Sequence, residues 1–391
     1  MKHHYELLSP AGSFTSLVAA ITSGADAVYF GLEDFNMRAT AKNFSLVDLP
    51  KIKKICGKKV KMYLTLNTIV YDNELEKIEE IIKKAKKYVD AVICWDLAIV
   101  NLCKKYKIPF HISTQASVSN IESAKFYKKL GAERIILARE LNLAQIKKIS
   151  KIIDVECFIH GAMCVSVSGR CFTSQFLFNK SANRGDCLQP CRREYIIKDE
   201  DGNELKLENN TVMSAKDLCA LPFIEQLKKA GITAFKIEGR NREPEYVDTT
   251  TRVYRKALDK RLSNKEIEEL LKELKKVYNK EFSSGFFLGI PTSDDFSKTE
   301  NSSATHKKDF IGKIYHYFPQ VGVAAIKISS GKIKVGDELI ILGDRTGVVR
   351  HKIERIEINR KPVKEAKKGM EVGIKVPNAR KGDSVYLVIK K

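Results

Sequence analysis

The chain has 391 residues, enough to bury a large core and to form more than one domain. Lys and Arg outnumber Asp and Glu by 69 to 48, and the net charge of +21 favours an anionic partner such as nucleic acid or a membrane surface. Nine cysteines, an odd number, cannot all form disulfides within one chain, as an oxidising compartment would favour. No apolar run is long enough to span a bilayer, and the N-terminal residues lack the apolar core of a signal peptide. We therefore expect a cytoplasmic protein with no membrane segment.

Short apolar runs alternate with helix-like segments through the first 240 residues. Between the runs, segments such as 74–88 and 142–153 carry apolar residues at helical spacing. Alternating strands and helices predict a parallel sheet, and eight repeats predict closure into a (β/α)8 TIM-like barrel. An open doubly wound sheet is the alternative, but no glycine fingerprint follows the first run. The eight runs are residues 5–9, 26–30, 61–66, 90–95, 109–113, 134–138, 155–159 and 233–237.

Polar residues follow the apolar runs, at the end of the barrel where chemistry usually takes place. A barrel interior tolerates few unpaired polar groups, so a polar ring at this end favours a ligand site. Each residue alone can equally be a loop cap or a structural hydrogen-bond partner. The ring consists of Ser9, Asn67, Asp96, Thr114, Gln115, Arg139, Glu140, His160, Glu238 and Arg240.

Residues 161–232 form a long insertion after the seventh run, and it contains four clustered cysteines. Six residues separate Cys164 from Cys171, fifteen separate Cys171 from Cys187, and three separate Cys187 from Cys191. Grouped thiolates in a cytosolic chain favour metal over disulfides. Structural zinc usually takes two tight pairs, whereas cluster spacings vary, so a 4Fe-4S cluster fits better than zinc or ordinary buried thiols. Cys219 is an alternative fourth ligand.

The last segment, 307–391, contains short β-branched alternations separated by glycine turns, which predict a small β-barrel. It carries 20 Lys and Arg against 9 Asp and Glu, a surplus that suits phosphate contacts with RNA or a merely solubilising surface. KIKVGDELIILG and KKGMEVGIKV resemble the second domain of elongation factor Tu. We therefore expect a catalytic barrel over 1–285, a linker over 286–306 and a basic RNA-binding domain over 307–391.

The motifs ECFIHGAMC, SGRC and GDCLQPCR, with SPAG, STQ, SAKDL and KIEGR, resemble the collagenase-like (U-type) peptidase family. Members of that family are now largely understood as iron-sulfur hydroxylases of RNA or of quinone precursors. With the C-terminal barrel, the resemblance implies a tRNA hydroxylase that converts the wobble uridine to 5-hydroxyuridine with prephenate as hydroxyl source. It further implies tRNA and the iron-sulfur assembly machinery as partners, and leaves the oligomeric state open.

Under this resemblance Cys164, Cys171, Cys187 and Cys191 hold the 4Fe-4S cluster. The proton carriers would be Glu156, His160 and Glu238. The substrate-binding residues would be Asn67, Gln115, Arg170, Lys236 and Arg240, of which the cationic ones suit the two carboxylates of prephenate.

Four other functions stay open from the sequence, and the first is a cysteine-dependent or metal-dependent peptidase. A cysteine peptidase would pair Cys164 or Cys171 with His160, which leaves the remaining cysteines without a use. An rRNA cytidine hydroxylase or a quinone-precursor hydroxylase subunit would share the cluster. An RNA-binding accessory protein would use the cluster only as a structural support.

Overall fold

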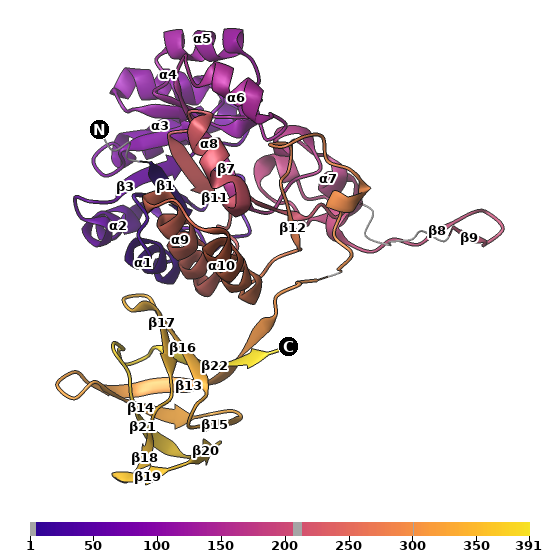
Figure 1. Ribbon diagram of the computed structural model, residues 1–391. Coiled ribbons are helices and arrows are strands. Elements are labelled where there is room, and N and C mark those ends of the chain that lie inside the picture. The colour runs from indigo at the N-terminus through magenta and orange to yellow at the C-terminus, as the bar shows by residue number, and fades with distance from the viewer. Residues whose placement is uncertain (1–4, 206–212, 300) are drawn as a thin grey trace.

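Eight parallel strands form a closed barrel in a computed structural model that describes residues 5–205, 213–299 and 301–391 (Figure 1). The strand order runs from β11 through β1 to β7, and β7 pairs with β11 to close the cylinder. Each predicted apolar run overlaps one barrel strand, so the TIM-like fold is confirmed and the open sheet is excluded. The strands are β1 (Glu6–Pro10), β2 (Ala27–Gly31), β3 (Lys61–Thr65), β4 (Ala91–Cys94), β5 (Phe110–Ile112), β6 (Arg134–Ile136), β7 (Asp154–Gly161) and β11 (Ala234–Ile237).

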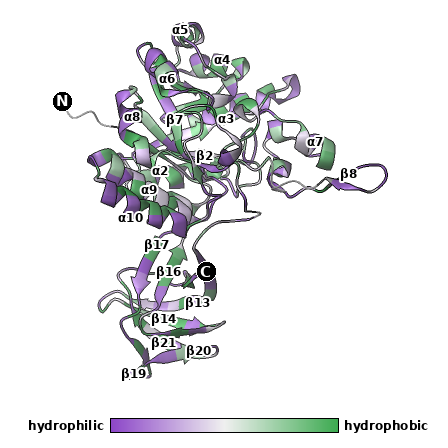
Figure 2. Ribbon diagram, turned by 45° about the vertical axis from the view of Figure 1, so that its right-hand side comes forward, coloured by the Kyte–Doolittle hydropathy of each residue, from purple (hydrophilic) through white to green (hydrophobic). Residues whose placement is uncertain are grey.

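Helices follow the strands and cover the outside of the barrel. In α3, for example, Ile78, Ile81 and Ile82 lie on one face and are buried, because apolar residues at this spacing share one side of a helix. Hydrophilic residues lie on the opposite helix faces, as Figure 2 shows for α10. The helices that cover the barrel are α1 (Phe14–Thr22), α2 (Leu49–Cys56), α3 (Leu75–Ala85), α4 (Leu97–Tyr106), α5 (Ile121–Leu130), α6 (Leu143–Ile149), α8 (Ile224–Lys229), α9 (Pro244–Asp259) and α10 (Asn264–Lys276).

The insertion leaves the barrel after β7 and returns through α8 to β11. It projects to one side of the barrel with α7 at its centre and the hairpin of β8 and β9 beyond it (Figure 1). The hairpin occurs where residues 199–204 predict a turn. The elements of this region are η4 (Val167–Gly169), α7 (Thr173–Phe178), η5 (Ala182–Arg184), η6 (Pro190–Arg192), β8 (Ile197–Lys198), β9 (Glu204–Leu205) and β10 (Asp217–Cys219).

Residues 286–306, expected to be a linker, run beside the insertion before the C-terminal sheet begins. Strand β12 (Phe282–Ser283) pairs with β10, and a bridge joins Phe296 to Ala215. Phe287 packs against the core of the barrel. This segment therefore makes specific contacts, and the exact domain limits stay a prediction.

The C-terminal segment folds into antiparallel sheets around its own apolar core. This fold agrees with the predicted small β-domain. Its strands are β13 (His306–Phe318), β14 (Val323–Ile328), β15 (Lys332–Lys334), β16 (Glu338–Gly343), β17 (Gly347–Lys352), β18 (Ile356–Ile358), β19 (Lys361–Val363), β20 (Glu365–Lys367), β21 (Glu371–Lys375) and β22 (Ser384–Lys390).

The C-terminal domain packs on α1 and α9 of the barrel. Arg350 in β17 donates to the Thr249 hydroxyl at 2.9 Å, and the Thr15 hydroxyl donates to Asp344 at 2.7 Å. A side chain at Gly347 would meet Val18 of α1 at 2.9 Å, so the two backbones approach closely here. Among the residues that the structure describes, no helix is long and apolar enough to cross a membrane.

Candidate active site

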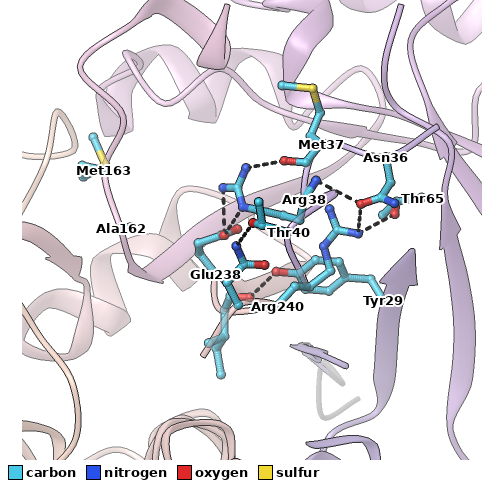
Figure 3. Close-up of polar contacts among 12 residues, drawn as sticks. Tyr29, Asn36, Met37, Arg38, Thr40, Thr65, Ala162, Met163, Glu238 and Arg240 are labelled. Carbon is cyan, nitrogen blue, oxygen red and sulfur yellow. Dashed lines mark hydrogen bonds and ion pairs between the residues drawn. The ribbon is translucent and has the colours of Figure 1, made fainter. Parts of the chain in front are cut away.

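Arginine side chains gather around one carboxylate at the carboxyl end of the barrel strands (Figure 3). Glu238 follows β11, and its Oε1 accepts from Nη2 of Arg38 at 2.9 Å and from Nε at 3.1 Å. Arg38 lies in the loop after β2. Nearby, Nη1 of Arg240 donates to Asn36 at 3.0 Å and to Thr65 at 2.9 Å. Barrel closure brings these loops together, because β11 and β2 both pair with β1.

Electrostatics keep Glu238 ionised. Burial raises the pKa of Glu238, but the charges of Arg38, Arg139 and Arg240 outweigh burial and lower it to about 2. Glu238 in turn raises the pKa of Arg38. Burial lowers the pKa of Arg240 to about 10, which still leaves this guanidinium charged at neutral pH. The cluster therefore combines one negative carboxylate with an excess of positive charge.

Two further arginines place unused donors around a cavity of about 120 Å³. Arg139 stacks on Phe158 at 4.1 Å, and Arg192 donates to the Met163 carbonyl at 3.0 Å. Both line the cavity with Arg38. Within the described residues, Nε of Arg139 and Nη1 of Arg192 are buried without a hydrogen-bond partner. Arg192 already pairs with buried Asp217 at 3.6 Å, so Arg139 is the residue whose unpaired buried donor favours an anionic acceptor.

The four signature cysteines gather at the same place. Cys164, Cys187 and Cys191 line the cavity. The pKa of the Cys191 thiol is raised to about 11, first by burial and then by the nearby thiols of Cys164, Cys187 and Cys171, while Arg192 opposes these effects. Cys171 lies beside Thr173, whose hydroxyl is 3.1 Å from the sulfur and whose amide donates to it at 3.4 Å. The insertion thus folds to bring Cys164, Cys187 and Cys191 to one cavity, with Cys171 in the same segment of the insertion.

These residues fit an iron-sulfur cluster by their chemistry. In the part of the chain that the structure describes, no group of three or more His, Cys, Asp or Glu side chains could hold a single metal ion. The cysteines of a cluster bind different iron atoms, so they lie further apart than the ligands of one ion. Partly exposed thiols around a common cavity suit that arrangement.

Cys219, the alternative ligand, lies elsewhere. It ends β10, pairs in register with His160 of β7, and is buried. The Tyr254 hydroxyl donates to its sulfur at 3.6 Å. Burial raises the pKa of its thiol to about 11. Cys191, not Cys219, is therefore the cysteine that accompanies the other three.

His160 and Glu156, two expected proton carriers, lie away from the cavity. Nδ1 of His160 is 3.3 Å from the Tyr254 hydroxyl, and burial lowers its pKa to about 3, so the ring is neutral. Glu156 is fully buried inside the barrel, 2.9 Å from Lys236 and 3.5 Å from Arg134. The structure does not bring these two side chains together with the cysteines.

The expected substrate-binding residues lie in different parts of the molecule. Gln115 lines the cavity and accepts from Nδ2 of Asn67 at 3.3 Å, so these amides lie at the mouth. Arg170 is exposed and donates to the Ser117 hydroxyl at 2.9 Å. Lys236 lies within the barrel, where its amine sits 4.3 Å from the Tyr29 ring centroid.

Sequence analysis missed Arg38 and Arg192 as site residues and placed Arg139 only in the polar ring. Arg38 lies in a loop with no motif of its own, whereas Arg192 directly follows a signature cysteine. Its position beside Cys191 is the signal that could have identified it.

Comparisons with known proteins agree with this architecture. Residues 12–297 match the model of peptidase family U32, and residues 322–388 match elongation factor Tu domain 2. A protein named collagenase from Porphyromonas gingivalis is 40% identical, with 99% of this chain and 98% of that protein covered. The tRNA hydroxylation protein P1 of Bacillus subtilis is 32% identical over 90% of this chain and 86% of its own length.

A further relative matches a smaller part of the chain. The 23S rRNA 5-hydroxycytidine C2501 synthase of Escherichia coli is 42% identical, covering 66% of this chain and 40% of its own length. The family match spans most of the chain, from the first βα loop through the cysteine insertion to the segment beside it. The chain belongs to peptidase family U32.

Proposed function

We propose that this chain is an RNA hydroxylase that acts on an unpaired base at the barrel mouth. The observation that carries the proposal is the common cavity, onto which cysteines and arginine donors both open. The names of the B. subtilis and E. coli relatives support RNA hydroxylation as the reaction class. The basic C-terminal domain supports RNA over a quinone precursor as substrate.

In this proposal Cys164, Cys171, Cys187 and Cys191 hold a 4Fe-4S cluster at the edge of the cavity. When bound, such a cluster supplies electron-transfer chemistry to the site. Arg192 lies beside Cys191 and opposes the negative charge that four thiolates accumulate. The insertion therefore both gathers the sulfur ligands and contributes a cation next to them.

The arginines bind the hydroxyl donor, which we propose to be prephenate. A dicarboxylate has the acceptors that the free donors of Arg139 and Arg192 lack. Arg38 adds a third guanidinium to the cavity wall, and Glu238 holds it through a two-donor contact. Since Glu238 has a pKa of about 2, it acts at neutral pH as a positioning carboxylate without a proton to donate.

The target base is proposed to be the wobble uridine of tRNA. A base must leave its stack to enter an enclosed cavity, which costs least in a single-stranded loop. Gln115 lines the cavity, and because Asn67 and Ser113 donate to its Oε1, its amide nitrogen is the group that can donate to a base edge. The same geometry accommodates an rRNA cytidine, so the RNA target is decided by experiment.

The name of the P. gingivalis relative favours a peptidase as the second candidate. A cysteine peptidase needs a base beside its thiol. His160, the base expected from sequence, is buried against Tyr254, Tyr246 and Phe282 instead of lying beside Cys164 or Cys171. This geometry gives the hydroxylase the stronger support.

The test is the nucleoside profile of RNA from a strain that lacks the gene, complemented with wild type, Cys171→Ala or Cys219→Ala. Mass spectrometry should find 5-hydroxyuridine in tRNA with wild type and Cys219→Ala, and none with Cys171→Ala. Hydroxycytidine in rRNA would redirect the target. Full modification with Cys171→Ala would reject the catalytic role of the cysteine cluster.

A further inference from the structure

A second, larger cavity of about 590 Å³ lies between the barrel and the C-terminal domain. The barrel contributes the loop at 40–42, the start of α1 and the loop from Arg240 to Pro244. The C-terminal domain contributes the β16–β17 turn and residues 380–384. We propose that this interdomain cleft holds the phosphate backbone of the substrate RNA next to the base that enters the barrel mouth. Its cationic residues are Lys42, Arg240, Arg242, Arg345, Arg380 and Lys381.

The charges in the cleft are unbalanced in favour of an anion. Arg240 is buried. Among the described residues, the other five cations form no ion pair. Arg380 donates to the Arg345 carbonyl at 2.8 Å, Arg242 stacks on the Tyr278 ring at 3.6 Å, and the cleft also contains three acidic residues. Asp344 accepts from Thr15 at 2.7 Å, Asp383 accepts from Thr346 at 2.6 Å, and Glu243 pairs with Lys308 at 3.2 Å. Six cations against these three carboxylates leave the cleft a formal excess of three positive charges, the sign that a phosphate-binding groove requires.

Two helices begin at the same cleft. The first turn of α1, capped by Ser13, and the first residue of α9, Pro244, both line it. Helix N-termini carry partial positive charge and free amide groups that favour phosphate. Each helix follows a barrel strand, so the cleft lies on the same face of the barrel as the candidate active site.

The cleft and the active-site cavity share a wall. Thr40 and Asn241 line both cavities, and Nδ2 of Asn241 donates to the Thr40 hydroxyl at 2.8 Å. Figure 3 places Thr40 beside Arg38 and Glu238. A strand whose phosphates occupy the cleft thus has a nucleotide at the shared wall, from which a base reaches the cavity on the other side.

Tyr386 provides a stacking surface at the C-terminal side of the cleft. It is partly exposed, its ring meets that of Phe310 edge to face with centroids 5.5 Å apart, and the Lys308 amine lies over the ring at 4.9 Å. Aromatic faces next to a cationic groove suit single-stranded RNA, because every base can stack. The combination favours an unpaired strand as the occupant.

This inference rests on the proposed function for the identity of its ligand, so its test measures binding separately from reaction. The full-length protein is titrated with a fluorescent single-stranded RNA oligonucleotide at several salt concentrations. The triple variant Lys42→Gln/Arg345→Gln/Lys381→Gln should bind about tenfold more weakly or worse near physiological salt. Its slope of log affinity against log salt should fall by about two to three, one for each lost phosphate contact.

The matched control, Lys361→Gln/Lys364→Gln/Lys368→Gln, removes the same charge from the region of β19 at the far end of the C-terminal domain (Figure 1). All six residues are exposed, so both variants should fold. Weaker binding in the cleft variant alone supports the inference, even if no hydroxylated nucleoside is found and the proposed reaction fails. Unchanged binding, equal losses in both variants, or no RNA binding by wild type would overturn it.

Discussion

Arg38 and Glu238 are 200 positions apart in the chain, yet Nη2 of Arg38 lies 2.9 Å from Oε1 of Glu238. Barrel closure makes this contact, and the contact in turn sets the charge of the cavity. Without Glu238, the guanidiniums of Arg38, Arg139 and Arg240 would repel one another with no buried anion nearby.

Glu238→Gln should therefore destabilise the protein. Removing one partner of a buried ion pair costs about 3–5 kcal/mol, and we expect the low end of that range because the Arg38 side chain remains 31% exposed. Chemical unfolding measures the change in free energy. Glu200→Gln, at an exposed turn of the insertion, is the control and should change stability little. Equal stability of wild type and Glu238→Gln would show that the arginines need no internal anion.

Cys191→Ala and Cys219→Ala should differ in iron content. If the cluster is held as proposed, anaerobically purified wild type and Cys219→Ala should contain roughly four irons and absorb near 400 nm, whereas Cys191→Ala should lose both signals. The reason is position, since Cys191 lies beside the other thiols and Cys219 lies against Tyr254. The reverse pattern would assign Cys219 as the fourth ligand. Zinc in place of iron would contradict the cluster itself.

Arg139→Met should weaken prephenate binding. A hydrogen bond to a charged group contributes about 1.5–3 kcal/mol, which corresponds to roughly 10- to 100-fold in dissociation constant. Calorimetry under anaerobic conditions measures the affinity. Arg193→Met is the matched control, because Arg193 also stacks on a phenylalanine, Phe178 at 4.6 Å, but does not line the cavity. Similar losses in both variants would argue against a carboxylate site at Arg139.

His160→Phe should make stability less sensitive to acid. The pKa of His160 is about 3 in the folded protein, below its ordinary value of 6.5, so below pH 6.5 the unfolded chain binds a proton that the folded chain does not. The stability of wild type should fall as pH decreases from 6.5, by up to about 1.4 kcal/mol per pH unit from this group.

The variant lacks this contribution while it keeps a ring against Tyr246 and Phe282. His111, whose pKa is also lowered by burial, is present in both proteins and cancels in the difference. Unfolding measured between pH 5 and 7.5 gives the two slopes. Parallel slopes would contradict the lowered pKa of His160. Loss of RNA hydroxylation by a folded His160→Phe protein would restore His160 as a candidate proton carrier.

The barrel could be predicted from sequence because each strand is a short apolar run bounded by polar residues, and eight of them recur. The approach of Cys164, Cys187 and Cys191 to one cavity could be predicted because they share one loop, and the role of Cys171 stays a prediction. The roles of His160 and Glu156 could not be derived from motif position. Side-chain direction along β7 turns Glu156 into the barrel and leaves His160 against α9, and sequence order alone does not reveal where a strand twists or bulges.

Arg38 could not be found for a different reason. Its partner, Glu238, lies 200 positions away in the sequence, and only the closed sheet brings the two positions together. The same holds for the interdomain cleft, whose cations come from widely separated loops. Residues that only the tertiary structure brings together show no recognisable spacing pattern in the sequence.

The close approach of Gly347 to Val18 makes the orientation of the C-terminal domain a matter of backbone stereochemistry. A domain held in this way has a fixed orientation relative to the barrel. In the proposed complex, that orientation also sets the direction in which the bound RNA strand approaches the arginines. Exchange of this domain between relatives would then succeed only if the contact surface around Val18 and Gly347 is exchanged with it.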